Sequence, residues 1–527
     1  MRWALVIALA LFAAPASAKK DIEADALRAA RHLASWRFEE ARKVIAELAA
    51  DAPNAPETKY LRAELAFLDG EYQKAIESLQ GLAGDAVDGN VGSLRQLAAS
   101  TIEATRGFAA QKSPGGHFII HYQPGKDEAI VELTGEVLDA AYKAMNEDFG
   151  YAAPEPVRVE ILGAPADLAR VSTLTEKEIE TTGTIALCKY GKLMVVTPRA
   201  TVFGYPWMDT MVHEYVHYVI SRMSHDKVPV WLHEGLARYQ QVRWRGPATR
   251  PLSAMDEHLL AAALKKNDLI SFDDMHPSMA KLPSQKAAAL AFAEVATMVA
   301  YVHQEGGYGA LRKAIAAIKQ GKSARKAVAE SLGRKWPEVE KGWLQYLKAA
   351  KLRSSPALAG RAGRQIRFKS GEGDDENVGT DDIANARARK HARLGGILRV
   401  RGMSDAAAIE YEKALAASGG GGPPDPYVAG KLSRTYLDLK KYDRAIELAR
   451  PLISADESDA APATTLGLAY QATGRAREAA DAFEIALRVS PFDPAVRCGL
   501  AEAYDKLADK ARAKREARAC QRVAQAE

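Results

Sequence analysis

Two histidines separated by one helical turn, with a glutamate directly after the first, are the residues of this sequence best suited to metal chemistry. His213 and His217 lie within residues 208–220, MDTMVHEYVHYVI, whose pattern predicts a helix. Residues four apart share one face of a helix, so both imidazoles can bind one Zn²⁺ at about 2.0–2.1 Å. Glu214 is turned by roughly 100° from His213, so its carboxylate can reach a water on the ion instead of sharing the ion.

The chemistry that such a set supports is hydrolysis by an activated water. A bound zinc ion lowers the pKa of its water toward about 7 and polarises a carbonyl group. A carboxylate such as Glu214 takes the proton and returns it to the leaving amine. A catalytic zinc takes three protein ligands and keeps one open position. Glu234, 17 residues beyond His217 in the segment VPVWLHEGLARY, is predicted to supply the third ligand from the next helix.

The residues around Glu234 are interpreted as support for that second helix. Pro229 and Trp231 are expected to form the loop and the packing that aim it back at the first helix. Gly235 has no side chain and permits close approach of two helices. His233, directly before Glu234, is expected to point elsewhere, either as a surface residue or as a residue that supports a ligand.

The motif HEYVH, followed by WLHEGLA, resembles the gluzincin clan of zinc metallopeptidases, the peptidase MA-like group. The resemblance implies that His213, His217 and Glu234 bind zinc and that Glu214 is the general base in peptide-bond hydrolysis. It also implies that the strand hairpin before the first helix includes an edge strand, which aligns an extended polypeptide substrate by backbone pairing. Bacterial proteins that join such a domain to tetratricopeptide repeats are similar overall.

One position departs from this family. A tyrosine often stands in such relatives where this sequence has Phe292, and a phenylalanine ring cannot donate a hydrogen bond to an oxyanion. Three functions therefore remain open: an active zinc peptidase, a peptidase-like scaffold that keeps the metal without turnover, or a metallohydrolase acting on another substrate such as cell-wall peptide. The residues that could replace the missing donor are Tyr301, Tyr239, Tyr205, His258 and His276.

The elements that must position these residues belong to a predicted α+β domain at residues 111–350. The chain has 527 residues, which predicts roughly two to four domains. Alternating β-branched residues predict strands at 117–122 and 157–162, and a hairpin within 183–198. We expect a small mixed sheet, then the helix that carries the motif, then a helical lobe that extends to about residue 348.

Helical repeats are predicted on both sides of this domain. Residues 388–527 show a period of 34 residues, with small and aromatic side chains at the offsets of tetratricopeptide repeats. Residues 19–110 carry a weaker form of the pattern, for which a generic alanine-rich helical hairpin is the alternative. Residues 351–387 are rich in Gly, Ser and charge and are predicted to form a linker. Stacked repeats usually bind another protein or peptide on their concave face.

The first residues and the overall charge predict the compartment. Residues 1–18 combine Arg2, an apolar run and an Ala-Ser-Ala cleavage site, which is typical of a secretory signal peptide. The run is too short to span a bilayer. We therefore expect export to the bacterial periplasm or the extracellular space, with no integral membrane segment after cleavage. The net charge of +5, without a long basic block, does not favour binding of nucleic acid.

The three cysteines cannot all pair within one chain. Cys498 and Cys520 fall in the two antiparallel helices predicted for the last repeat. They either form a disulfide, which export permits, or are buried as small apolar residues. Cys188 is expected to be a core residue and not a nucleophile, because no histidine partner is evident nearby.

Overall fold

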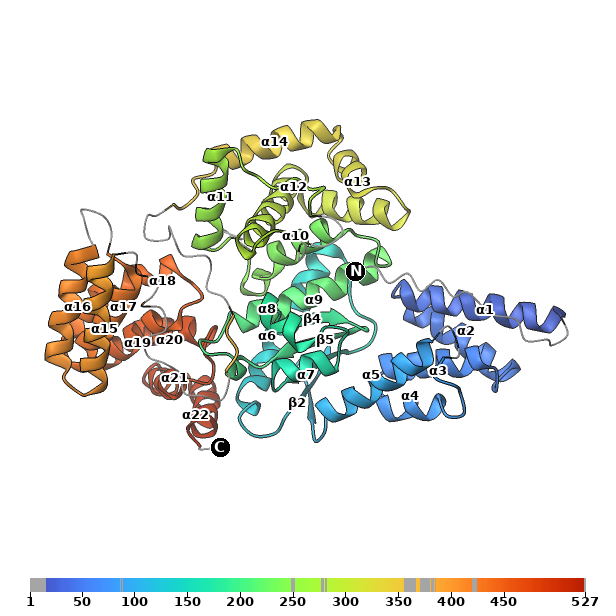
Figure 1. The fold of residues 1–527 in the computed structure, drawn as a ribbon, viewed down its shortest axis with the longest axis horizontal. Helices are drawn as coiled ribbons and strands as arrows, with labels where there is room; N and C mark the ends of the chain where they lie inside the picture. The colour runs from blue at the N-terminus through green and yellow to red at the C-terminus, as the bar shows by residue number, and fades with distance from the viewer. Residues whose placement is uncertain are drawn as a thin grey trace.

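The computed structural model describes most of the chain and shows a central domain between two groups of helices. Figure 1 shows the central domain in teal, green and yellow, the N-terminal helices in blue and the C-terminal helices in orange and red. Almost all of the predicted signal peptide, residues 1–18, and most of the predicted linker, residues 351–387, lie outside the described residues. None of the described helices has the length and apolar character that a membrane span requires. The structure describes all residues except 1–15, 86, 88, 248–251, 276–278, 280–281, 355–365, 370–379, 381–382, 384, 419–423 and 526–527.

The central domain contains a mixed sheet with the strand order β1-β2-β3-β5-β4. Strands β2, β3 and β5 are parallel, and the edge strands β1 and β4 run antiparallel to their neighbours. The predicted α+β class is confirmed, whereas β1 is a strand that the sequence did not predict. Its four residues, AAQK, are short and mostly exposed and show no apolar alternation. The strands are β1 (Ala109–Lys112), β2 (Phe118–Tyr122), β3 (Val157–Leu162), β4 (Ala186–Lys189) and β5 (Lys192–Val196).

The sheet separates two layers of helices because side chains alternate along each strand. Val159 and Ile161 of β3 pack with α6 and α9 on one face. Leu162 of β3 and Met194 of β5 pack with α7 and α8 on the other face. The turn between β4 and β5 uses Tyr190 and Gly191, both with positive φ, which suits a tight hairpin. The helices of these layers are α6 (Glu128–Phe149), α7 (Pro165–Arg170), α8 (Glu176–Thr182) and α9 (Trp207–Ser224).

A helical lobe follows α9, and its long helix α12 packs closely against α10. A Cβ atom built on Gly235 of α10 would lie 2.6 Å from the carbonyl oxygen of Val295, so only glycine fits there. The close approach that Gly235 permits is therefore made to α12. The helices of this lobe are α10 (Val230–Gln240), α11 (Ala254–Lys266), α12 (Gln285–Lys319), α13 (Ala324–Ser331) and α14 (Trp336–Ala349).

The first four of the five N-terminal helices form two packed pairs, α5 packs against α4, and α4 joins this group to the sheet through a buried polar cluster. Tyr72 of α4 donates to Oε1 of Glu160 on β3 at 2.5 Å. The Lys192 ammonium lies 2.8 Å from Glu160 Oε2, and the Arg158 guanidinium lies 2.7 Å from Oε1. Each polar atom of Glu160 is thus paired, as burial requires. The helices are α1 (Ala16–Ala34), α2 (Phe38–Asp51), α3 (Pro56–Leu68), α4 (Tyr72–Ser78) and α5 (Asn90–Ala104).

We expect Glu160 to make the stability of this junction depend on acid pH. Burial alone would raise the pKa of Glu160, but Lys192 and Arg158 outweigh it and lower the pKa from 4.5 to about 2. A lowered folded-state pKa stabilises the fold above pH 4.5, and this contribution is lost as the pH falls toward 2. Urea unfolding of wild type and Glu160→Gln should therefore give a difference in free energy that shrinks between about pH 6 and about pH 3. A difference that is independent of pH would contradict this assignment.

The C-terminal helices form four antiparallel pairs whose contacts use the small residues of the repeat pattern. A Cβ atom on Gly467 or on Gly499 would lie 2.5 Å or 2.4 Å from the ring of Phe483, so both glycines leave room for that ring. Cys498 and Cys520 form a disulfide between α21 and α22. The pairs are α15 (Ala386–Val400) with α16 (Ser404–Ser418), α17 (Pro426–Asp438) with α18 (Tyr442–Ala455), α19 (Ala460–Ala472) with α20 (Ala476–Leu487), and α21 (Pro494–Lys506) with α22 (Lys510–Ala524).

The last pair of helices docks on α6 of the central domain. Ala519 and Val523 of α22 bury an apolar contact with Ala129 of α6. Arg497 of α21 is fully buried, and its guanidinium donates to Glu516 at 2.7 Å and to the carbonyl oxygen of Ala129 at 2.8 Å. The repeats are therefore held against the central domain by packing as well as by charge. Three ion pairs flank the contact, Glu128 with Arg522, Glu132 with Arg518 and Glu136 with Arg515.

The substitution Arg497→Met should destabilise this junction strongly. It removes the cation from Oε2 of the buried Glu516, while Arg515 still donates to Oε1 at 2.9 Å. Breaking a buried ion pair costs about 3–5 kcal/mol, and we expect a loss toward the lower end of that range. Arg518→Ala is the matched control, because its pair with Glu132 is about half exposed and should contribute at most about 1 kcal/mol. Urea unfolding monitored by circular dichroism measures both changes. Equal effects of the two substitutions would show that the buried pair does not anchor the repeats.

Candidate active site

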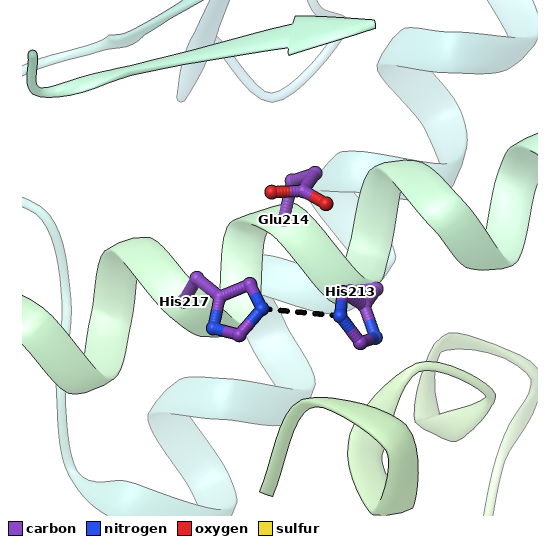
Figure 2. Close-up of side chains that lie close together, drawn as sticks. All are labelled: His213, Glu214 and His217. Carbon is purple, nitrogen blue, oxygen red and sulfur yellow. Dashed lines mark hydrogen bonds between the residues drawn. The ribbon is translucent and has the colours of Figure 1, made fainter. Parts of the chain in front are cut away.

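His213 and His217 project from the same side of α9, and Glu234 of α10 completes a group of three converging side chains. Figure 2 shows the two imidazoles side by side, with Glu214 on a different side of the helix. The Nε2 atoms of the two histidines are 3.1 Å apart. Oε2 of Glu234 lies 3.3 Å from Nε2 of His213 and 3.5 Å from Nε2 of His217. The structure therefore brings together the three residues that the sequence assigns to the metal.

The size of this triangle fits a zinc ion. Four ligands at about 2.0–2.1 Å in a tetrahedron stand about 3.3 Å from one another. The three separations of 3.1, 3.3 and 3.5 Å bracket that value. Two imidazole nitrogens and one carboxylate oxygen are also a donor set that catalytic zinc takes. The residues present thus fit the ion in distance and in chemistry.

Both helices of the site are anchored at their first turn. Trp207, the first residue of α9, is fully buried, and its indole N–H donates to the carbonyl oxygen of Leu487 in the C-terminal repeats at 3.0 Å. The backbone N–H of Tyr205 also donates to these repeats, at the carbonyl oxygen of Val489. The ring of Trp231 in α10 packs against Phe272 of the helical lobe. The repeats therefore help to position the helix that carries both histidines.

The tautomer of His213 is set by a neighbouring amide. Its Nδ1 lies 3.3 Å from the side-chain oxygen Oε1 of Gln241. An amide oxygen only accepts hydrogen bonds, so Nδ1 of His213 carries the proton. The lone pair is then on Nε2, which faces His217 and Glu234. The imidazole is therefore held in the form that binds a metal.

The two carboxylates of the site have opposite pKa shifts. Burial raises the pKa of Glu214 to about 7, although His217 and a hydrogen bond from the backbone N–H of Cys188 act against this shift. Burial would also raise the pKa of Glu234, but without a bound ion His217 and His213, when protonated, hold it well below its usual range. Glu234 is therefore ionised, as a metal ligand must be. Glu214 exchanges a proton near neutral pH, which suits a general base.

The edge strand β4 runs beside α9 on the side of Glu214. Among the described strands, β4 pairs only with β5, so its outer edge is free of a strand partner. The hydrogen bond from Cys188 to Glu214 fixes the strand next to the carboxylate. Cys188 itself is partly buried, and burial raises the pKa of its thiol well above the usual value. This thiol is thus not activated as a nucleophile.

The residues considered as oxyanion donors are engaged elsewhere. The hydroxyl of Tyr301 accepts a hydrogen bond from Arg334 at 2.7 Å, and Tyr205 donates to the carbonyl oxygen of Val196. The hydroxyl of Tyr239 lies 2.9 Å from Nδ1 of His303. Nδ1 of His258 lies near Oγ of Ser354, and His276 lies outside the described residues. The ring of Phe292 packs near the guanidinium of Arg238.

The residues that contact the Nδ1 atoms of the two histidines were only partly anticipated from the sequence. His233 was expected to point away from the ligands, yet its Nδ1 lies 2.5 Å from Nδ1 of His217, which matches the alternative of a supporting residue. Gln241 was not considered, because it lies beyond the recognised motif. The sequence signal for His233 is its position directly before Glu234 on α10, whereas Gln241 follows the last residue of α10 and carries no such signal. Their contacts depend on the angle at which α10 crosses α9.

The comparisons with known proteins identify a family for the central domain. Residues 138–349, which include all four predicted site residues, match the family described as Peptidase MA superfamily. No curated protein matches the chain. Among solved structures, MamA AMB-1 is 26% identical, covers 26% of this chain and 78% of its own, and has a TM-score of 0.24. TTC0263, a thermophilic TPR protein in Thermus thermophilus, is 23% identical over 26% of this chain and 74% of its own, with a TM-score of 0.23.

Proposed function

We propose that this chain, in which a peptidase MA-like domain is joined to tetratricopeptide-like repeats, is an exported zinc-dependent peptidase. The observation that carries the proposal is the convergence of His213, His217 and Glu234. The carboxylate of Glu214 lies within 4.8 Å of both histidines and accepts a hydrogen bond from the edge strand β4. His213, His217 and Glu234 would hold the ion. When bound, zinc would lower the pKa of a coordinated water and polarise the scissile carbonyl.

Glu214 performs the proton transfers of the proposed reaction. Its carboxylate takes a proton from the attacking water, whose oxygen bonds to the carbonyl carbon of the substrate. Glu214 then delivers this proton to the leaving nitrogen as the C–N bond breaks. A pKa of about 7 allows the same group to accept and to release a proton near neutral pH. The products are a carboxylate and a free amine.

The free edge of β4 supports an extended polypeptide as the substrate class. A peptide that adds as a strand gains backbone hydrogen bonds along its length, whatever its side chains. Cys188 of β4 contacts Glu214, so a strand paired there passes beside the general base. The repeats supply protein recognition in this proposal, as helical repeats commonly do. The disulfide between Cys498 and Cys520 supports an oxidising compartment outside the cytoplasm.

A peptidase-like scaffold is the second candidate function. The observation that favours it is the absence of a hydroxyl at Phe292, together with the engagement of Tyr239 and Tyr301 by other side chains. Loss of an oxyanion donor costs a factor of about 10²–10³ in turnover. In this case the protein would bind zinc and a partner without measurable hydrolysis.

Assay of the purified mature protein tests the two candidates against each other. Wild-type protein is incubated with an unfolded polypeptide, with and without 1,10-phenanthroline, and then with zinc added back. We expect cleavage that the chelator abolishes and zinc restores. Zinc bound without cleavage would support the scaffold, and cleavage that is unaffected by the chelator would overturn both candidates.

A further inference from the structure

Four side chains around the site form one continuous line of hydrogen bonds that starts at a proposed metal ligand. Nδ1 of His217 lies 2.5 Å from Nδ1 of His233, and Nε2 of His233 lies 3.3 Å from Oγ of Ser221. The Ser221 hydroxyl donates to Oδ1 of Asp226 at 3.0 Å. His217 and Ser221 belong to α9, Asp226 to the turn after it, and His233 to α10.

The direction of every bond in this line follows from its last member. The carboxylate of Asp226 can only accept a hydrogen bond, so the Ser221 hydroxyl donates its single proton to Asp226. Ser221 then accepts from His233, whose Nε2 must carry a proton. The other nitrogen of a neutral His233 is an acceptor, so Nδ1 of His217 is the donor. The lone pair of His217 is thereby on Nε2, the atom that faces His213 and Glu234.

The same assignment follows from the metal end. A histidine that binds a metal through Nε2 carries its proton on Nδ1 and needs an acceptor for it. His233 offers that acceptor only if its own proton is on Nε2. Oγ of Ser221 is within reach of that proton and accepts the hydrogen bond, and the Ser221 hydroxyl in turn donates to Asp226. Both ends thus require the same arrangement of protons.

The backbone around Asp226 holds the end of the line in place. His225 and Asp226 have φ values of 56° and 57°, so the chain reverses through two consecutive left-handed residues after α9. The backbone N–H of Asp226 donates to the carbonyl oxygen of Ser221 at 2.9 Å. Backbone and side chain of Asp226 therefore both engage Ser221. Asp and His tolerate this conformation better than most residues.

We propose that His233, Ser221 and Asp226 are positioning residues that fix His217 in its metal-binding tautomer and orientation. The inference rests on the proposed function, because it concerns a ligand of the proposed zinc ion. It assigns to His233 a role separate from that of Glu234, its neighbour on α10. It also explains why a buried serine stands one turn after His217 on α9.

The test measures zinc affinity of the full chain by competition with a chromophoric chelator. His233→Leu removes the acceptor and should weaken zinc binding by about 10–100-fold. His233→Asn places an amide oxygen near the former Nδ1 and should restore most of the affinity. Ser221→Ala leaves Nε2–H of His233 without its acceptor and should give a smaller loss. The absorption spectrum of the Co²⁺-substituted protein should change in His233→Leu and return toward wild type in His233→Asn.

Ser224→Ala is the matched control for Ser221→Ala. Ser224 is a fully buried serine on the same helix, and its hydroxyl has no hydrogen-bond partner among the described residues. This substitution should leave zinc affinity unchanged. Because both serine substitutions are small, they decide the question even if His233→Leu does not fold, as checked by circular dichroism.

Two results would overturn the inference, and they are distinguishable. If wild type binds zinc but Ser221→Ala matches Ser224→Ala and His233→Asn matches His233→Leu, the line of hydrogen bonds does not position His217, and the proposed function stands. If wild type binds no zinc, the proposed function and this inference fail together.

Discussion

Replacing Glu214 with glutamine is expected to lower the rate of peptide hydrolysis by a factor of about 10²–10⁴ while zinc remains bound. Glutamine has nearly the same shape, but its amide cannot take a proton from the attacking water. The ligand atoms of His213, His217 and Glu234 are unchanged by the substitution. Initial rates on an unfolded polypeptide, measured beside zinc content, separate this loss of proton transfer from a loss of metal.

Glu294→Gln is the control for the Glu214 substitution. Glu294 lies in the same domain and is fully buried, and burial raises its pKa to about 8. Its carboxyl is therefore neutral at pH 7, so a neutral amide replaces it with little change in charge. We expect wild-type activity from Glu294→Gln. If Glu214→Gln cleaves as fast as this control, Glu214 is not the general base.

Removing the carboxylate of Glu234 is expected to abolish stable zinc binding. Two imidazoles alone leave the site one protein ligand short of the three that a catalytic zinc takes. Glu234 is also the anion that lies 3.3 and 3.5 Å from the two Nε2 atoms, so its loss removes the charge that balances the ion. Elemental analysis should fall from about one zinc per chain in wild type to near zero in Glu234→Ala.

The control for Glu234→Ala is Glu330→Ala. Glu330 lies on α13 and makes only exposed ion pairs with Lys322 and Lys326. This variant should retain zinc and activity at wild-type levels. Zinc retained in Glu234→Ala at the same level would remove Glu234 from the proposed ligand set.

Helical periodicity is the reason that the sequence could predict the juxtaposition of His213 and His217. His213 and His217 must share a face of any helix that contains both, whatever the rest of the fold. Predicting the position of Glu234 required knowledge of the second motif, WLHEGLA, because the approach of Glu234 to the histidines depends on the reversal between α9 and α10. The resemblance to a known family supplied that knowledge, and the structure places Glu234 in contact with both histidines.

The contacts between segments that lie far apart in the chain could not be predicted from the sequence. Glu128, Glu132 and Glu136 follow one another at intervals of four, a pattern that equally describes a solvated helix face. Only the folded chain shows that α22 covers them with arginines. In the same way, nothing in the spacing of Trp207 indicates that its indole bonds to the last repeats. Such contacts join residues far apart in sequence and depend on the packing of whole helices.

A crystal of the purified protein, measured at the zinc absorption edge, tests the central claim most directly. We expect one anomalous peak within about 2.0–2.1 Å of Nε2 of His213, Nε2 of His217 and a carboxylate oxygen of Glu234. Absence of a peak at that position in zinc-supplemented crystals, or a peak bound by other residues, would contradict it.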